Sequence, residues 1–233
     1  LIVNCQLSIV NLSFNPLILS ILVQTMIMKT INDNLSYFKG PISNTNPKET
    51  LSLYAVSKMV MLDLELKEAT NKVRSGLWSK TAKLPYITPS GCFTRRKDNK
   101  MVSYSGLICI DLDHLDKDPA SAPDSNSNCQ LSIVNRRTAS AFAIGEANCQ
   151  LSENQHINTL KHMLFEDHFL KPAFIFVSPS GNGLKIFIRI RDAVFSSHKD
   201  YIKAISLYLL EHYNLTADPA CSSISNACLL CHD

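Results

Sequence analysis

An apolar run that ends in two acids places the strongest constraint on how this chain can fold. In the stretch Tyr104–Asp116, the residues from Leu107 to Ile110 have the character of a buried strand, and Asp111 and Asp113 follow directly. On a strand, residues i and i+2 point to the same side, so both carboxylates share one face. They repel each other there, and a divalent cation held by both would relieve that cost. A plain turn at a strand end, where Asp is common, explains the pattern equally simply.

The spacing of apolar residues elsewhere predicts an α+β fold. Helical spacing runs through residues 47–74 and 155–169, and a capping box at Ser197–Asp200 opens a third helical segment. Residues 92–113 indicate two strands around a turn at Lys97–Lys100, residues 173–179 and 184–191 indicate two more, and residues 226–232 indicate a last strand. We therefore expect a mainly antiparallel sheet flanked by helices.

A short repeat shapes the expected domain organisation. The peptide NCQLSIVN occupies residues 4–11 and 128–135, and NCQLS recurs at 148–152. The copies are too short and too irregular in position for a solenoid, and they indicate translated repetitive DNA, with a duplicated functional peptide as the alternative. We expect residues 1–28 to be a leader outside the fold. We expect residues 120–152 to be an insertion into a domain of residues 29–233 that is truncated at its C-terminus.

Composition and charge exclude little. A formal net charge of +3 over 233 residues permits a nucleic-acid partner without requiring one. The apolar run from residue 17 to residue 28 is well short of the roughly 20 residues that a membrane helix needs, and no basic segment precedes it. We therefore expect a cytoplasmic protein without a membrane partner, whose 8 cysteines are mostly reduced.

A Ser- and Gly-rich segment between two predicted strands is the second candidate for binding chemistry. In SPSGNGLK, Gly181 and Gly183 allow close approach of backbone to a ligand, and Ser178 and Ser180 can donate hydrogen bonds. Lys185 supplies a point charge suited to phosphate. The segment lacks the form of a Walker A loop, and an ordinary hairpin turn uses the same residue types.

The C-terminal cysteines permit three interpretations. Cys228, Cys231 and His232 fit the C-x-x-C-H pattern of covalent haem attachment, which requires export that the sequence does not indicate. Cys221 could extend the group into a zinc site, but its spacing to Cys228 is poor for that purpose. Because Leu229 and Leu230 separate the two cysteines, we expect both to be packing residues of a buried strand.

A basic cluster lies on the turn between the first two predicted strands. It consists of Arg95, Arg96, Lys97 and Lys100, and it can contact a nucleic-acid backbone. A solvated turn with no partner is the alternative. Lone histidines, among them His198, are most simply surface residues.

Four segments taken in order resemble a known family. KLPYITPSGCF, YSGLICIDLDHLD, FVSPSGNGLKIFIRI and the tail from residue 208 onward resemble the primase-like domain at the N-terminus of VirE-type replication proteins of mobile elements and plasmids. Such domains are distantly related to the archaeo-eukaryotic primase (PrimPol) superfamily. The resemblance implies a primase-core-like fold and a metal-dependent nucleotidyltransferase that acts as a DNA-directed primase or polymerase.

The resemblance also implies roles for particular residues. It makes Asp111 and Asp113 the metal ligands for Mg²⁺ or Mn²⁺, with Asp218 as a third catalytic acid. It implies that the nucleotide phosphates are bound by Ser178, Ser180, Gly181, Gly183 and Lys185. The partners that it implies are a nucleoside triphosphate, a DNA or RNA template and a helicase domain or protein. Asn226 stands where such domains carry arginine, which leaves a decayed, non-catalytic nucleic-acid-binding module as the alternative.

Overall fold

The computed structural model describes residues 33–115, 153–190 and 195–233. Every strand pair in this part of the chain is antiparallel, and helices accompany the sheets, which confirms the expected α+β class. The expected likeness to a primase core stays a prediction. The elements are β1 (Asn34–Phe38), β2 (Glu49–Ser52), α2 (Leu53–Leu62), α3 (Leu64–Arg74), α4 (Lys80–Lys83), β3 (Tyr86–Thr88), β4 (Gly91–Phe93), η1 (Asp98–Lys100), β5 (Met101–Tyr104), β6 (Leu107–Leu112), α5 (Glu153–Phe165), β7 (Phe174–Val177), β8 (Leu184–Arg189), η2 (Phe195–Ser197), α6 (His198–Tyr213), η3 (Pro219–Ser222) and β9 (Cys228–Leu229).

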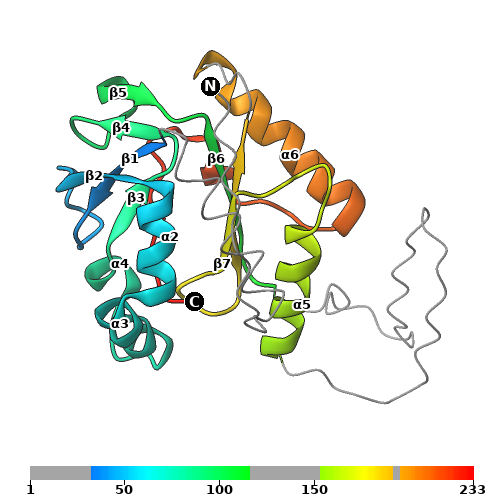
Figure 1. Cartoon of the computed structure of the whole chain (residues 1–233), viewed down its shortest axis with the longest axis horizontal. Coiled ribbons are helices and arrows are strands. Elements are labelled where there is room, and N and C mark those ends of the chain that lie inside the picture. The colour runs from blue at the N-terminus through cyan, green and yellow to red at the C-terminus, as the bar shows by residue number, and fades with distance from the viewer. Residues whose placement is uncertain (1–32, 116–152, 191–194) are drawn as a thin grey trace, which may run out of the picture.

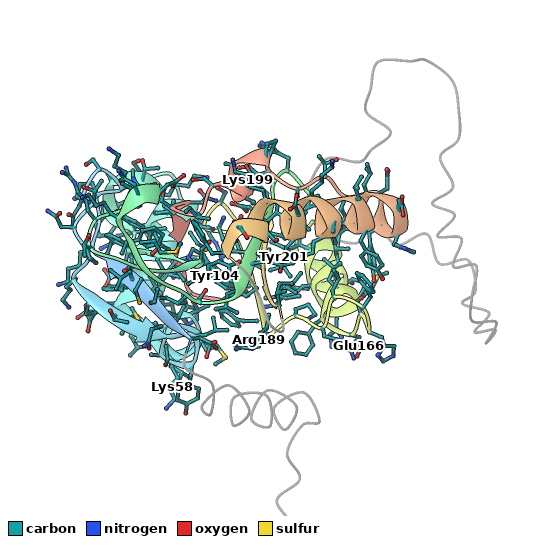
Figure 2. All side chains as sticks on the ribbon, turned by 90° about the horizontal axis from the view of Figure 1, so that it is seen from above. Lys58, Tyr104, Glu166, Arg189, Lys199 and Tyr201 are labelled. Atoms are coloured by element: carbon teal, nitrogen blue, oxygen red, sulfur yellow. The ribbon has the colours of Figure 1, made fainter. Side chains whose placement is uncertain are left out.

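A central sheet of order β6-β8-β7 separates two hydrophobic cores (Figure 1). One face packs against α2 and the sheet β2-β1-β3-β9, and we call the space between them the first core. The other face packs against α5 and α6, and that space is the second core. In Figure 2, Lys58 marks α2 on one side of the molecule and Glu166 marks the end of α5 on the other.

Strand alternation explains why the strands of the central sheet are apolar almost throughout. In β6, Ile108 and Ile110 face the second core, whereas Leu107 faces the first. In β8, Phe187 faces the first core, and Ile186 faces the second. A strand covered on both faces cannot show an alternating polar pattern, so a short continuous apolar run is the expected signal.

The alternation also directs two charged side chains inward. The register pairs Asp111 of β6 with Lys185 of β8, and both continue the row of residues that faces the first core. At the other end of the same strands, Arg189 lies opposite Leu107 and forms an ion pair with the buried Asp33. The central sheet therefore carries one ion pair at each end of its first-core face.

Several local predictions were wrong. Residues 49–52, which were expected to be helical, form the edge strand β2. The long strand expected up to residue 113 is divided at Gly106, where φ is +73°, so that β5 pairs with β4 and β6 pairs with β8. Ser197 makes no side-chain capping hydrogen bond at the start of α6, so the capping box is absent. His198, expected at the surface, is 2% exposed.

The expected leader, residues 1–28, and the expected insertion, residues 120–152, lie outside the described residues, and both stay predictions. Within the described ranges, no helix is long and apolar enough to cross a membrane.

Candidate metal and phosphate site

Three aspartates converge beside the end of β6. Asp111 is the fifth residue of that strand, Asp113 follows it, and Asp218 comes from the segment between α6 and η3. One ligand atom from each lies within 4.8 Å of the others. In the described part of the chain, this is the group of acidic, histidine or cysteine side chains whose geometry suits a metal ion. Asp111 and Asp113, which the sequence predicts on one face of a strand, therefore lie close to each other and to Asp218.

Backbone contacts fix Asp218 in this position. Its N–H donates to the carbonyl oxygen of Asp111 at 2.9 Å, so the segment runs along the free edge of β6. Its side chain accepts from the N–H of Ala220 at 2.8 Å and caps η3, with Pro219 in the first helical position. The cap uses one carboxylate oxygen and leaves the other available to a ligand.

Lys185 neutralises part of this negative charge. Its ammonium group donates to Oδ2 of Asp111 in an ion pair that is nearly closed to solvent. Burial raises the pKa of Asp111, Lys185 offsets part of that rise, and the repulsion from Asp113 and Asp218 adds to it. Burial alone would lower the pKa of Lys185, but its neighbours, Asp111 among them, raise it overall, so the ammonium stays protonated.

One buried carboxylate oxygen of the cluster has no hydrogen-bond partner. Oδ1 of Asp111 is buried and makes no hydrogen bond, although its companion oxygen holds Lys185. A buried carboxylate oxygen without a hydrogen bond is costly, and ligands and ions are common reasons for its persistence. The donor set is all oxygen, which is the set that Mg²⁺ and Mn²⁺ prefer.

The Ser- and Gly-rich segment forms the turn between β7 and β8, next to the acids. The N–H of Ser178 donates to the carbonyl of Gly183 at 2.8 Å and closes the turn. A Cβ on Gly183 would lie 2.3 Å from the carbonyl oxygen of Leu112, so only glycine fits there. The same position is 3.1 Å from Oγ of Ser178 and 3.3 Å from Cα of Asp113, which shows how closely the turn adjoins the acids.

The side chains of the turn have different surroundings. Ser178 is 2% exposed, and its Oγ has no hydrogen-bond partner. Ser180 is exposed and accepts a hydrogen bond from Lys80 at 3.0 Å. Gly181 has a φ of +83°, a conformation that glycine adopts without strain. Lys185, expected to meet phosphate directly, is instead committed to Asp111.

The predicted nucleic-acid contacts are largely engaged within the protein. Arg96 donates to the carbonyl of Ile42 at 2.9 Å and lies over the ring of Tyr86, so it packs the loop against the fold. Arg95 donates to Oγ1 of Thr45 at 2.9 Å at the surface, and Lys97 is exposed. A role in nucleic-acid binding stays a prediction for this loop.

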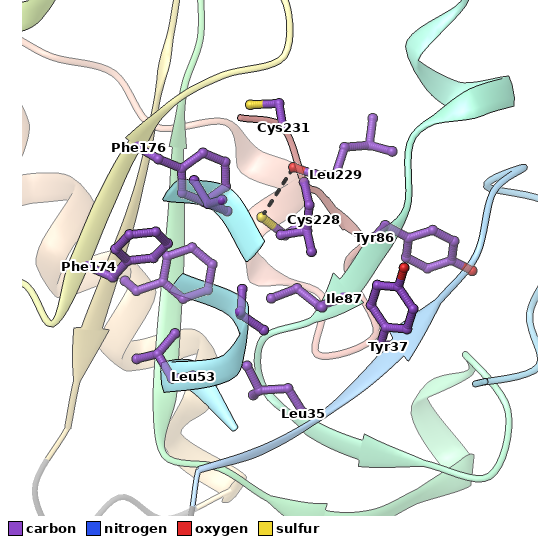
Figure 3. Packing of buried hydrophobic residues seen from close by; sticks show 14 of the residues in the cluster. Leu35, Tyr37, Leu53, Tyr86, Ile87, Phe174, Phe176, Cys228, Leu229 and Cys231 are labelled. Carbon is purple, nitrogen blue, oxygen red and sulfur yellow. Dashed lines mark hydrogen bonds between the residues drawn. The ribbon is translucent and has the colours of Figure 1, made fainter. Parts of the chain in front are cut away.

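The cysteines belong to the first core. Figure 3 shows Cys228 and Cys231 among aromatic and aliphatic side chains, and both are at most 3% exposed. The thiol of Cys231 donates to the carbonyl of Val177 at 3.0 Å, and burial raises its pKa to about 12. Both cysteines therefore pack inside the first core, as the sequence predicted.

Sequence analysis missed two kinds of residue. His198 contacts Oγ of Ser90 and the hydroxyl of Tyr104, at 3.4 and 2.9 Å. Arg74 and Lys80, from helices far away in the sequence, contact the Ser178–Gly183 turn. No local signal identifies these residues, because each contact joins segments about a hundred positions apart.

Fold and site together define the class of the protein: an α+β domain with an acidic, oxygen-only site at the end of a buried antiparallel strand. More specifically, the chain belongs to the family described as BT4734-like, N-terminal domain, whose model matches residues 79–123 and 149–233, together more than half of the chain. These segments include all three aspartates and the Ser178–Gly183 turn. No curated protein and no solved structure matches the chain.

This family differs from the one that the motifs resembled. The assignment to VirE-type primase domains is wrong, because the matching model is that of the BT4734-like N-terminal domain. Short strand-end acids and Gly-rich turns recur in unrelated phosphate-binding proteins, so their order alone was an insufficient guide. Residues 124–148 are unmatched and fall inside the expected insertion, which stays a prediction.

Proposed function

We propose that Asp111, Asp113 and Asp218 hold Mg²⁺ or Mn²⁺ and that the domain binds a nucleoside triphosphate beside it, for nucleotidyl transfer of the primase or polymerase type. The observation that carries the proposal is the convergence of three carboxylates, one of which, Asp111, has a buried oxygen without a hydrogen bond. The primase or polymerase type of transfer and the association with mobile elements came with the family resemblance alone, and the geometry supports only the metal and phosphate chemistry.

The chain's own residues would prepare the site for phosphate. A divalent cation bound here would neutralise phosphate oxygens and stabilise the charge that develops during transfer. Lys185 holds Asp111 in a fixed orientation, and the Ser178–Gly183 turn presents the Ser178 hydroxyl next to the acids. Because Gly183 has no side chain, the turn packs directly against the backbone of Leu112 and Asp113 and stays beside the acids. Exposed Arg95 and Lys97 are the proposed contacts for a template.

Calorimetric titration with a nucleoside triphosphate, with and without Mn²⁺, tests the proposal. Asp113→Asn is the preferred variant, because Asp113 is exposed, whereas changing Asp111 would strand the buried ammonium of Lys185. We expect Mn²⁺-dependent binding in the wild type and a loss of at least about tenfold in the variant. Asp200→Asn, the same change at an exposed position of α6, is the matched control. If wild type and Asp113→Asn bind the nucleoside triphosphate with equal affinity in Mn²⁺, the three aspartates do not hold the metal.

A non-catalytic nucleic-acid-binding module is the second candidate. The ammonium of Lys185 already occupies one oxygen of Asp111, an arrangement that a protein without a metal cofactor would also need. That candidate predicts binding of a single-stranded oligonucleotide and no Mn²⁺-dependent heat with a nucleoside triphosphate. The same calorimeter run therefore separates the two functions.

A further inference from the structure

The proposed phosphate site lacks an available cation among the residues that the sequence assigned to it. Lys185 is 6% exposed, and its ammonium is paired with Asp111. A triphosphate carries several negative charges, and the three aspartates add more. A metal ion alone would leave the distal phosphates beside the Ser178–Gly183 turn without a positive partner, so another source of charge is required.

Two basic side chains from outside the turn meet it. Arg74, the last residue of α3, donates from Nη2 to the carbonyl oxygen of Ser178 at 3.3 Å, and a Cβ on Gly181 would lie 3.7 Å from its Nε. Lys80, the first residue of α4, donates from Nζ to Oγ of Ser180 at 3.0 Å. The turn is therefore bordered by an arginine and a lysine, and both are exposed.

Neither contact uses all the hydrogen-bond donors of its basic side chain. A guanidinium group has five N–H donors and an ammonium group has three, and each of these bonds to the turn uses one. A basic residue in the last turn of a helix is common because it complements the helix dipole. That preference accounts for a cation at Arg74, but it does not account for its contact with a turn 104 positions away.

We propose that Arg74 and Lys80 bind the distal phosphates of the nucleoside triphosphate, above the Ser178–Gly183 turn, an inference that rests on the proposed function. Three observations carry it: the two cations meet the turn, Lys185 is already paired, and the buried Oγ of Ser178 has no hydrogen-bond partner. Arg74 supplies a planar fork suited to two phosphate oxygens, and Lys80 supplies a point charge. The pair makes the site selective for triphosphates over monophosphates.

Two titrations test the assignment in Arg74→Ala and Lys80→Ala. The first uses inorganic tripolyphosphate in the absence of metal, and the second compares a nucleoside triphosphate with its monophosphate in Mn²⁺. We expect each variant to bind both triphosphate probes at least about tenfold more weakly and the monophosphate almost unchanged. Lys58→Ala, which removes the same charge from the outer surface of α2, is the matched control (Figure 2) and should bind like the wild type.

The possible results refute different claims. If the wild type binds nucleoside triphosphate with Mn²⁺ and the two variants match it, the role of Arg74 and Lys80 is overturned and the proposed function stands. If the wild type shows no Mn²⁺-dependent binding but tripolyphosphate binding depends on both residues, the cation pair stands as an anion site and the proposed function falls. Weaker binding of a single-stranded oligonucleotide with unchanged triphosphate binding would assign the pair to nucleic acid and overturn the inference.

Discussion

Removing Lys185 tests whether the acid cluster depends on its internal counter-ion. In the wild type the ammonium pairs with Asp111, and the two side chains are 7% and 19% exposed. Breaking one side of such a buried pair typically costs about 3–5 kcal/mol, because the remaining charge stays buried without compensation. Asp111 keeps some solvent contact, so we expect Lys185→Met to lose about 3 kcal/mol of unfolding free energy in urea, measured in EDTA.

The loss should depend on pH in a defined direction. Without Lys185, burial and the neighbouring acids raise the pKa of Asp111 further, so the native state holds a proton that the unfolded chain has already released. Stability is then lost as pH rises from the ordinary aspartate pKa of about 3.9 through the raised native value. The difference between wild type and Lys185→Met should therefore be small near about pH 4 and largest at about pH 8.

A double variant and added metal complete the test. Asp111→Asn combined with Lys185→Met removes both charges and should recover most of the stability that either single change loses. Mn²⁺ should stabilise Lys185→Met more than the wild type, because the cation replaces the missing ammonium. Losses that simply add in the double variant, or a Lys185→Met protein as stable as the wild type, would refute the counter-ion reasoning.

Three further changes have defined outcomes. Gly183→Ala forces a Cβ to within 2.3 Å of the Leu112 carbonyl, so we expect a loss of about 1–3 kcal/mol in urea unfolding, and an unchanged stability would show that the turn opens freely. Burial lowers the pKa of His198 below its ordinary 6.5, so the unfolded chain is protonated first, and the wild type should lose stability below about pH 6.5 relative to His198→Gln. Replacing Cys228 by Ala and Cys231 by Val should cost about 1–3 kcal/mol by denaturation, and zinc bound only by the wild type would contradict their role in packing.

The central sheet could be predicted from the sequence because its signals are local. The apolar run before Asp111 and the two apolar runs on either side of the Ser178–Gly183 turn each form most of one strand, although the start of β6 at Leu107 was not predicted. A turn of serine, proline and glycine between two strands also specifies an antiparallel pair. No local sequence pattern indicates that β6 pairs with β8. The contact between Lys185 and Asp111, which depends on that pairing, could therefore not be predicted.

The elements that the sequence did not reveal depend on distant contacts. In β1, the buried Ser36 accepts from the N–H of Phe93 at 2.8 Å, so a polar residue fits a core position only because another strand supplies its partner. His198 is buried for the same reason, since Tyr104 supplies its hydrogen bond from 94 positions away. Local patterning assigns such residues to the surface, where unpaired polar groups are normally found.

The acid cluster of this domain is assembled without the proposed metal. Many metal sites collect like charges that only the metal can neutralise, so the chain folds when the metal binds. Here Lys185 supplies a permanent positive charge to Asp111, and the backbone bond between Asp218 and Asp111 assembles the third acid without any ligand. The acids can then remain in place beside a buried strand, with one oxygen of Asp111 left free of hydrogen bonds. Under the proposed function, this arrangement would prepare the site before its ligand arrives, and the buried ion pair would have to stay intact.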